Sequence, residues 1–86
     1  MNIRLKLVGI QEMEQLIGGR EIVLQMEGST FGDLLSHLEE TYGRPLMKCL
    51  HCQILRNGKE WIRRDNLTYP LQDGDHITFL QMMGGG

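Results

Sequence analysis

Apolar and polar residues alternate strictly near the start of the chain, from Asn2 to Val8, with Ile3, Leu5 and Leu7 on one face. A period of two is typical of a strand that has one buried and one solvated face. The same alternation returns from Arg20 to Met26. We therefore predict two half-buried strands that pair antiparallel.

A helical period replaces the alternation in two places. Ser29 or Thr30 is placed to cap a helix, and the segment Thr30-Phe31-Gly32-Asp33 is a capping box with aspartate in its last position. Gly43 ends this helix, and Pro45 prevents it from resuming. Its apolar stripe needs a sheet to cover it and consists of Phe31, Leu34, Leu35, Leu38 and Tyr42. A shorter segment, from Gln11 to Ile17, predicts one or two helical turns with an apolar side made of Met13, Leu16 and Ile17.

Further strands are predicted in the second half of the chain. Asn57-Gly58 favours a type I′ hairpin turn, with residues 52–56 leading into it and residues 59–62 returning. We expect the following loop to tuck its apolar residues against the core, namely Leu67, Tyr69 and Leu71. The Asp73-Gly74-Asp75 turn then begins a last strand that carries Ile77 and Phe79.

The order of these elements predicts the fold class. One main helix crosses a mixed sheet of four to five strands, which indicates an α+β roll of the β-grasp (ubiquitin-like) kind. In such a roll the first and last strands are neighbours at the centre of the sheet. We interpret residues 1–83 as a single β-grasp domain and residues 84–86 as a flexible C-terminal glycine tail.

Composition narrows the possible classes of function. The 86 residues are 41% hydrophobic and 23% charged, which is ordinary for a soluble globular protein. A net charge of −2 and the absence of a Lys/Arg-rich run argue against nucleic acid as a partner. No segment approaches a membrane-spanning length, and the first residues do not have the pattern of a signal peptide. We therefore expect a cytoplasmic protein with no membrane partner.

Cys49-Leu50-His51-Cys52 is the main candidate for metal or redox chemistry. A structural zinc site needs four ligands, and this segment supplies at most three in poor mutual geometry. A thioredoxin-like pair would stand at the start of a helix, whereas this one precedes a strand. We therefore expect no metal and no bound cofactor, and we treat the two cysteines as half-buried small residues. Trp61 is expected to cover the edge of the core rather than to bind a partner.

The glycines at residues 84–86 allow two interpretations. They are either a frayed end, or a tail that enters a narrow active site on another protein. A residue without a Cβ lets the backbone pass between close-packed walls. A terminal carboxyl, whose reference pKa is roughly 3.3–3.7, is ionised at neutral pH and can attack an activated phosphate. The carboxyl of Gly86 is therefore the candidate working group.

Six segments together resemble the MoaD/ThiS family of ubiquitin-like sulfur-carrier proteins along nearly the whole chain. They are the early alternating strand, Gly18-Gly19, Thr30 to Leu35, Asn57-Gly58-Lys59, Leu71 to Ile77, and Gly85-Gly86 at the end. The last two are the most specific, because of the distance between the Leu-x-Asp-Gly-Asp turn and the glycines.

The resemblance implies a protein substrate rather than an enzyme. In that family an E1-like adenylating enzyme uses ATP and magnesium to join AMP to the terminal glycine carboxylate, which here would be Gly86. Sulfur from a persulfide-bearing donor enzyme then displaces AMP and leaves a thiocarboxylate. The partner-binding residues expected from this are the end of the last strand and the tail, namely Phe79, Leu80, Gln81, Met82, Met83, Gly84 and Gly85.

The pathway that receives the sulfur has two candidates. Residues 43–51 and Gly18-Gly19 are similar to the molybdopterin carrier, whereas Gln81-Met82-Met83 and the third glycine are nearer to some thiamine carriers. We favour the large subunit of molybdopterin synthase as acceptor, for a molybdenum or tungsten cofactor, and keep thiazole synthase as the alternative. Two further hypotheses are a ubiquitin-like tag joined to lysines through Gly86, and an interaction module with an idle tail.

Overall fold

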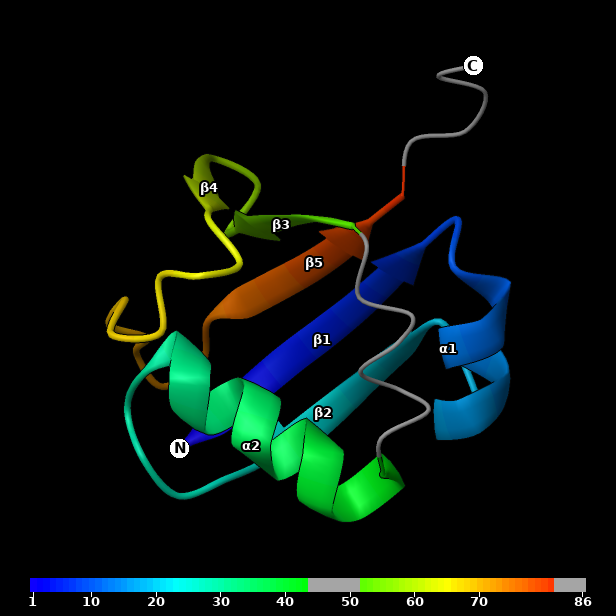
Figure 1. Ribbon diagram of the computed structural model, residues 1–86, viewed down its shortest axis with the longest axis horizontal. Helices are drawn as coiled ribbons and strands as arrows, with labels where there is room; N and C mark the ends of the chain where they lie inside the picture. Colours follow the sequence, from blue (N-terminus) through cyan, green and yellow to red (C-terminus); the bar gives the residue numbers. More distant parts are fainter. Residues whose placement is uncertain (44–51, 82–86) are drawn as a thin grey trace.

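The computed structural model describes residues 1–43 and 52–81. They form a mixed five-stranded sheet with one long and one short helix (Figure 1). In chain order the elements are β1 (Asn2–Val8), α1 (Gln11–Ile17), β2 (Glu21–Gln25), α2 (Phe31–Tyr42), β3 (Gln53–Arg56), β4 (Glu60–Ile62) and β5 (His76–Leu80). The predicted α+β class and the single long helix are confirmed. No helix in the described ranges is long and apolar enough to cross a membrane.

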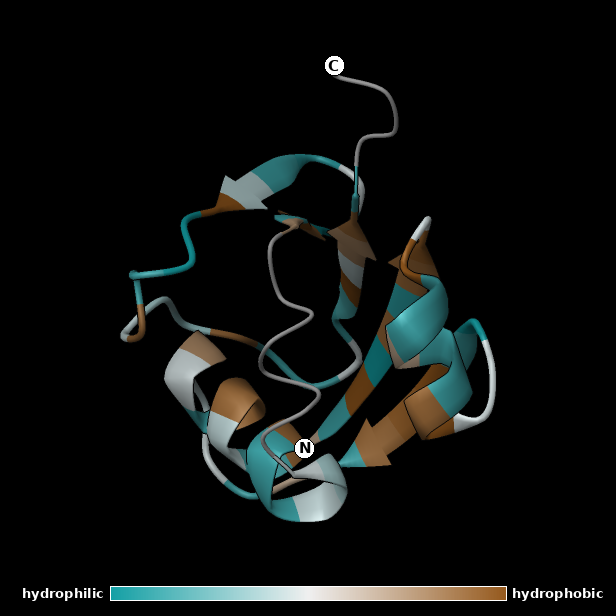
Figure 2. Ribbon diagram, turned by 45° about the vertical axis from the view of Figure 1, so that its right-hand side comes forward, coloured by the Kyte–Doolittle hydropathy of each residue, from teal (hydrophilic) through white to brown (hydrophobic). Residues whose placement is uncertain are grey.

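The first and last strands lie side by side in the middle of the sheet, as predicted (Figure 1). The strand order is β2-β1-β5-β3-β4, with β1 and β5 parallel and the other neighbours antiparallel. Leu5 is in register with Ile77, and Leu7 with Phe79. These four side chains point into the core and are almost completely buried. Alternating apolar and polar bands along the strands in Figure 2 show the period of two that predicted them.

Helix α2 covers one face of the sheet (Figure 1). Its start is fixed by the predicted capping box: Asp33 N–H donates to Thr30 Oγ1 at 3.2 Å, and Thr30 N–H donates to Asp33 Oδ2 at 3.1 Å. Gly43 ends the helix with a positive φ of 87°. Phe31, Leu34 and Leu38 are fully buried, and each contributes about 1.5–3 kcal/mol through burial.

The hairpin between β3 and β4 has the predicted turn. Asn57 and Gly58 both have positive φ, and Lys59 N–H donates to the Arg56 carbonyl at 3.0 Å. Strand β4 begins at Glu60, one residue later than predicted. Asn57 also connects the turn to β5: its N–H donates to the His76 carbonyl, and its side-chain oxygen accepts from His76 N–H.

Three apolar residues that the sequence placed in or against the core are exposed. Leu16 points outward because the short helix α1 buries only Met13. Leu67 is held through its carbonyl, which accepts from Gly32 N–H at 2.9 Å, and its side chain stays in solvent. Trp61 is 59% exposed, because β4 is an edge strand and Trp61 lies on the face away from α2. Of the loop residues, Leu71 is buried and Tyr69 half-buried, as predicted.

Candidate functional site

The C-terminal segment leaves the sheet from its centre. Leu80, the last residue of β5, pairs with Val8 of β1 on one side and with Gln53 of β3 on the other. The next residue, Gln81, is still attached, because its N–H donates to the Val8 carbonyl at 3.0 Å. The base of this segment is therefore held from both sides.

The predicted partner-binding residues divide into three groups. Phe79 is 0% exposed and belongs to the core, so the assignment of its side chain to a partner surface is corrected: even positions of β5 face outward and odd positions inward. Leu80 is half-buried and Gln81 is exposed, beside the end of β1. The rest of the predicted partner-binding set lies outside the described residues, namely Met82, Met83, Gly84 and Gly85, and so does Gly86, the predicted reacting residue.

Four apolar side chains gather on the sheet face opposite α2, next to Gln81. Val8 pairs with Leu80, Leu55 pairs with Trp61, and Leu80 and Leu55 are diagonal neighbours across β5 and β3. Val8 and Trp61 are exposed, while Leu55 and Leu80 are half-buried. We call Val8, Leu55, Trp61 and Leu80 the apolar corner. A cluster of this kind on an open sheet face is typical of a surface that binds a protein.

Sequence reasoning found only Leu80 of the apolar corner. A signal for Val8 was present, because in a strand of period two it shares the otherwise polar face of Asn2, Arg4 and Lys6. Leu55 and Trp61 needed the sheet order. Only the pairing of β3 with β5 brings them beside Leu80.

The remainder of this open face is polar apart from Val23, an exposed valine in register with Arg4. Arg4 pairs with Glu21 across β1 and β2, with 3.5 Å between Arg4 Nε and Glu21 Oε1. Lys6 and His76 are exposed in the same area. The charged side chains therefore lie on β1, β2 and the start of β5, whereas the apolar corner lies at the ends of β1 and β5 and on β3 and β4.

A buried ion pair fixes the start of β5. Asp75 is 5% exposed, and its carboxylate accepts from Arg56 Nε at 2.7 Å, Gln72 N–H at 2.8 Å and Asn57 Nδ2 at 3.1 Å. Burial opposes ionisation, but these hydrogen bonds, Arg56 foremost, outweigh it and hold the pKa of Asp75 below its usual value. The network joins the turn before β5 to the hairpin after β3. The sequence indicated only a turn at Asp75.

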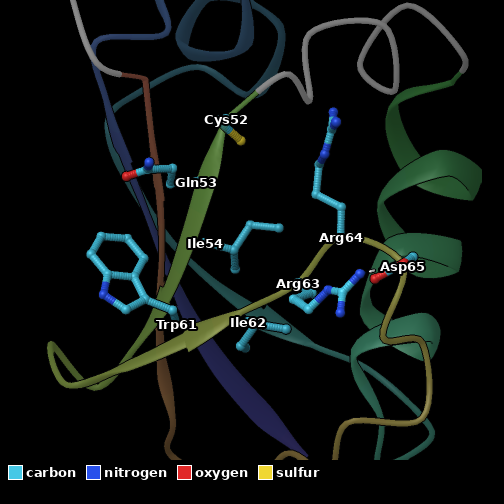
Figure 3. A pocket seen from close by; sticks show the side chains of 8 residues that line it. All are labelled: Cys52, Gln53, Ile54, Trp61, Ile62, Arg63, Arg64 and Asp65. Carbon is cyan, nitrogen blue, oxygen red and sulfur yellow. Dashed lines mark hydrogen bonds and ion pairs between the residues drawn. The ribbon is translucent and has the colours of Figure 1, made fainter.

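Cys52 lines an open pocket between β3, β4 and the loop that follows (Figure 3). Its side chain and those of Ile54 and Ile62 lie on one side of the strands, while Trp61 projects from the other. Burial raises the pKa of the Cys52 thiol to about 11, although nearby Arg64 partly opposes this, so the thiol is protonated at neutral pH.

The predicted cysteine–histidine segment can be followed only at Cys52. Cys49, Leu50 and His51 lie outside the described residues, so the expectation for that segment stays a prediction. Within residues 1–43 and 52–81, no three His, Cys, Asp or Glu side chains come together in a group that could hold a metal ion.

Solved structures with the same fold are ubiquitin-like proteins. Small archaeal modifier protein 1 from Haloferax volcanii superposes with a TM-score of 0.73 at 23% identity, covering 100% of both chains. The protein of the same name from Methanosarcina acetivorans gives 0.72 at 24% identity, covering 99% of this chain and 96% of that chain. These likenesses confirm the predicted β-grasp, ubiquitin-like fold.

A further solved structure is similar, and a family model shows the family. A complex of subunits 1 and 2 of molybdopterin-converting factor from Helicobacter pylori 26695 contains a similar chain, with a TM-score of 0.64, 27% identity and 100% coverage of both chains. No curated protein matches this sequence. The model of the ThiS family matches residues 10–86, and the chain therefore belongs to the ThiS family, whose members are small carrier or modifier proteins.

Proposed function

We propose that this protein is a sulfur carrier whose Gly86 carboxylate is adenylated by an E1-like enzyme and converted to a thiocarboxylate. Membership of the ThiS family carries the proposal, and the family match extends through the glycines to residue 86. The anchored position of Gln81 at the sheet centre supports it, because a firm base lets a partner receive the segment that follows in a defined place. In this proposal residues 1–83 are the recognition domain and residues 84–86 the tail.

The chemistry follows from the poor reactivity of a carboxylate as an electrophile. A carboxylate oxygen of Gly86 attacks the α-phosphate of ATP, and pyrophosphate leaves. A persulfide sulfur of the donor enzyme then attacks the acyl carbon, so that the bond to AMP breaks and an acyl disulfide forms. A second thiol of the donor reduces that S–S bond, which leaves the thiocarboxylate on Gly86 and a disulfide on the donor. ATP and magnesium belong to the partner, the carrier needs no cofactor of its own, and the use of ATP accords with the expected cytoplasmic location.

The first experiment is an intact-mass measurement. The protein is incubated with the E1-like enzyme, Mg-ATP and a persulfide donor, and we expect a mass gain equal to the exchange of one oxygen for sulfur. Gly86→Ala should slow the exchange because its methyl group obstructs a narrow channel. Gly19→Ala is the matched control, since a Cβ there meets nothing within 4 Å. The mass of the starting protein also tests whether Gly86 is the terminal residue, and absence of the exchange while a known carrier reacts would contradict the proposal.

The globular domain supplies recognition in this proposal, through the apolar corner together with Gln81 and residues 82–85. Trp61→Ala should raise KM for the adenylating enzyme more than about fivefold with kcat unchanged, because a buried interface aromatic contributes more than about 1 kcal/mol. Val23→Ala is the control, since Val23 is an exposed valine on the edge strand β2 away from the corner. Equal KM values for the two variants would remove the apolar corner from the docking surface.

The acceptor that we propose is the large subunit of a molybdopterin synthase. The similarity to a chain of the Helicobacter pylori molybdopterin-converting factor complex, over the full length of both chains, supports this choice. The thiocarboxylated protein is offered in parallel to a synthase large subunit with its precursor and to a thiazole synthase with its substrates. Loss of the thiocarboxylate with only the first confirms the choice, and loss with only the second assigns the thiamine pathway. Isopeptide adducts on lysines that disappear with Gly86 would instead assign protein tagging.

A further inference from the structure

We propose that Gly9 is a positioning residue that sets the direction in which the C-terminal segment leaves the sheet. A Cβ placed on Gly9 would lie 2.9 Å from the Gln81 carbonyl oxygen, which is closer than real Cβ contacts allow. Gly9 also has a φ of +75°, in the region that side chains rarely adopt. The consequence for sulfur loading rests on the proposed function, whereas the effect on Gln81 does not.

The close approach arises because β1 and β5 end together and then diverge. Val8 and Leu80 are the last pair of the parallel register. After this pair, Gly9 turns the backbone that leaves β1 toward Ile10 and helix α1. The backbone that leaves β5 continues to Gln81, whose N–H donates to the Val8 carbonyl. The backbone of Gln81 thus crosses over the Cα of Gly9 with no room for a side chain between them.

A side chain at Gly9 would displace Gln81 rather than Gly9 itself. The obstacle is a backbone carbonyl, which cannot rotate away as a flexible side chain can. Gly9 is fixed on both sides, by β1 and by Ile10, which is buried and whose carbonyl accepts the Glu14 N–H of α1. Gln81 is held here through its N–H to Val8. The weaker attachment yields, and the peptide that begins the C-terminal segment changes direction.

This displacement matters for a group that reacts at the end of the segment. Gln81 is the last residue that the structure describes and is bonded to β1, and the Gly86 carboxylate is proposed to react inside a partner. A misplacement of about 1 Å at a reacting group can cost about 10²-fold in rate. Gly9 variants displace Gln81, which is part of the proposed docking surface, but they leave the four side chains of the apolar corner in place. The expected signature is therefore a fall in kcat that is larger than the rise in KM.

Gly9→Ala and Gly58→Ala form a matched pair for the test. Gly58 has a φ of +70°, nearly that of Gly9, but a Cβ there meets nothing within 4 Å. Both variants therefore carry the same backbone strain, and only Gly9→Ala contacts Gln81. Gly9→Asn and Gly58→Asn form a second pair, in case strain unfolds the first, because asparagine tolerates positive φ while still adding a Cβ.

Two measurements are made on each pair. NMR hydrogen exchange of the Gln81 amide reports its bond to Val8, and ATP–pyrophosphate exchange with the adenylating enzyme reports tail activation. Relative to the Gly58 controls, we expect Gly9 variants to lose Gln81 protection at least about tenfold and to lower kcat at least about tenfold, with a smaller change in KM.

Equal Gln81 protection and equal kcat in the Gly9 and Gly58 variants would overturn the inference. If wild-type protein gives no pyrophosphate exchange, the proposed function fails. The Gln81 amide still decides the positioning role in that case, since it is measured on the carrier alone.

Discussion

Replacing Asp75 by asparagine removes a negative charge at the place where the last turn meets the β3–β4 hairpin, and it keeps the size of the side chain. Asp75 accepts hydrogen bonds from Arg56, Asn57 and the Gln72 N–H in a site that is 5% exposed. An asparagine can serve part of this set with its one carbonyl oxygen. Its NH₂ group then faces at least one of the remaining donors.

The size of the effect follows from the exposure of the partner. Removing one member of a buried ion pair costs about 3–5 kcal/mol, because the other charge stays buried. The Arg56 side chain is 16% exposed and retains Glu60, with 3.5 Å between Arg56 Nη1 and Glu60 Oε1. Water and Glu60 therefore recover part of the loss. We expect Asp75→Asn to lower the free energy of unfolding by about 2–4 kcal/mol at neutral pH.

Urea denaturation across a pH series measures this. The folded pKa of Asp75 is lowered, so its contribution is complete above the unfolded pKa of about 3.9 and is lost as the pH falls through the lower folded value. The gap between wild type and Asp75→Asn should therefore be constant near neutrality and should close in acid.

Asp65→Asn is the matched control, because Asp65 pairs with Arg63 at 3.2 Å while its side chain is 74% exposed. It should change stability by less than about 1 kcal/mol. If Asp75→Asn costs no more than this control, the buried pair does not stabilise the fold as we argue. A gap that persists undiminished in acid would show that the charge of Asp75 is not its origin.

Three further outcomes are expected. Thr30→Ala removes the acceptor of the capping box and should cost about 0.5–2 kcal/mol in urea denaturation, whereas alanine at the exposed Ser29 should change little; equal effects would contradict the box. Phe79→Ala leaves a cavity at the sheet centre and should cost about 3–5 kcal/mol by the same assay, and a loss below about 1 kcal/mol would contradict its burial. In a Cys49→Ser background, Cys52 should be alkylated more slowly at about pH 8 than cysteine in a short peptide, because burial raises the pKa of its thiol to about 11. The rate for Cys52 should then rise as the pH approaches 11. Equal rates for Cys52 and the peptide at about pH 8 would refute this.

The local sequence pattern was enough to predict the helices, strands and turns, because each is specified by a signal within a few residues. The alternation of β1, the capping box at Thr30 and the Asn57-Gly58 turn each specify their own backbone, and all three are confirmed. The central pairing of β1 with β5 came from the order of elements rather than from any local pattern.

The features that the sequence did not predict share a different cause: each depends on residues that are far away in the sequence. Arg56 and Asp75 are 19 positions apart, so neither shows by itself that the pair is buried. The exposure of Trp61 depends on β4 being an edge strand, which is a property of the whole sheet. The role argued for Gly9 depends on a backbone 72 positions later, at Gln81. A glycine after a strand otherwise indicates only a turn.

Because Gln81 is bonded to β1 at the centre of the sheet, the proposed function sets an upper limit on the depth to which the Gly86 carboxyl could reach into a partner. Five residues follow Gln81 as far as Gly86, and a fully extended chain of that length spans at most about 18 Å. An enzyme that activates Gly86 must therefore bind its nucleotide within that distance of the surface that contacts Gln81. A catalytic chamber set deeper would be out of reach, however tightly the two surfaces fitted.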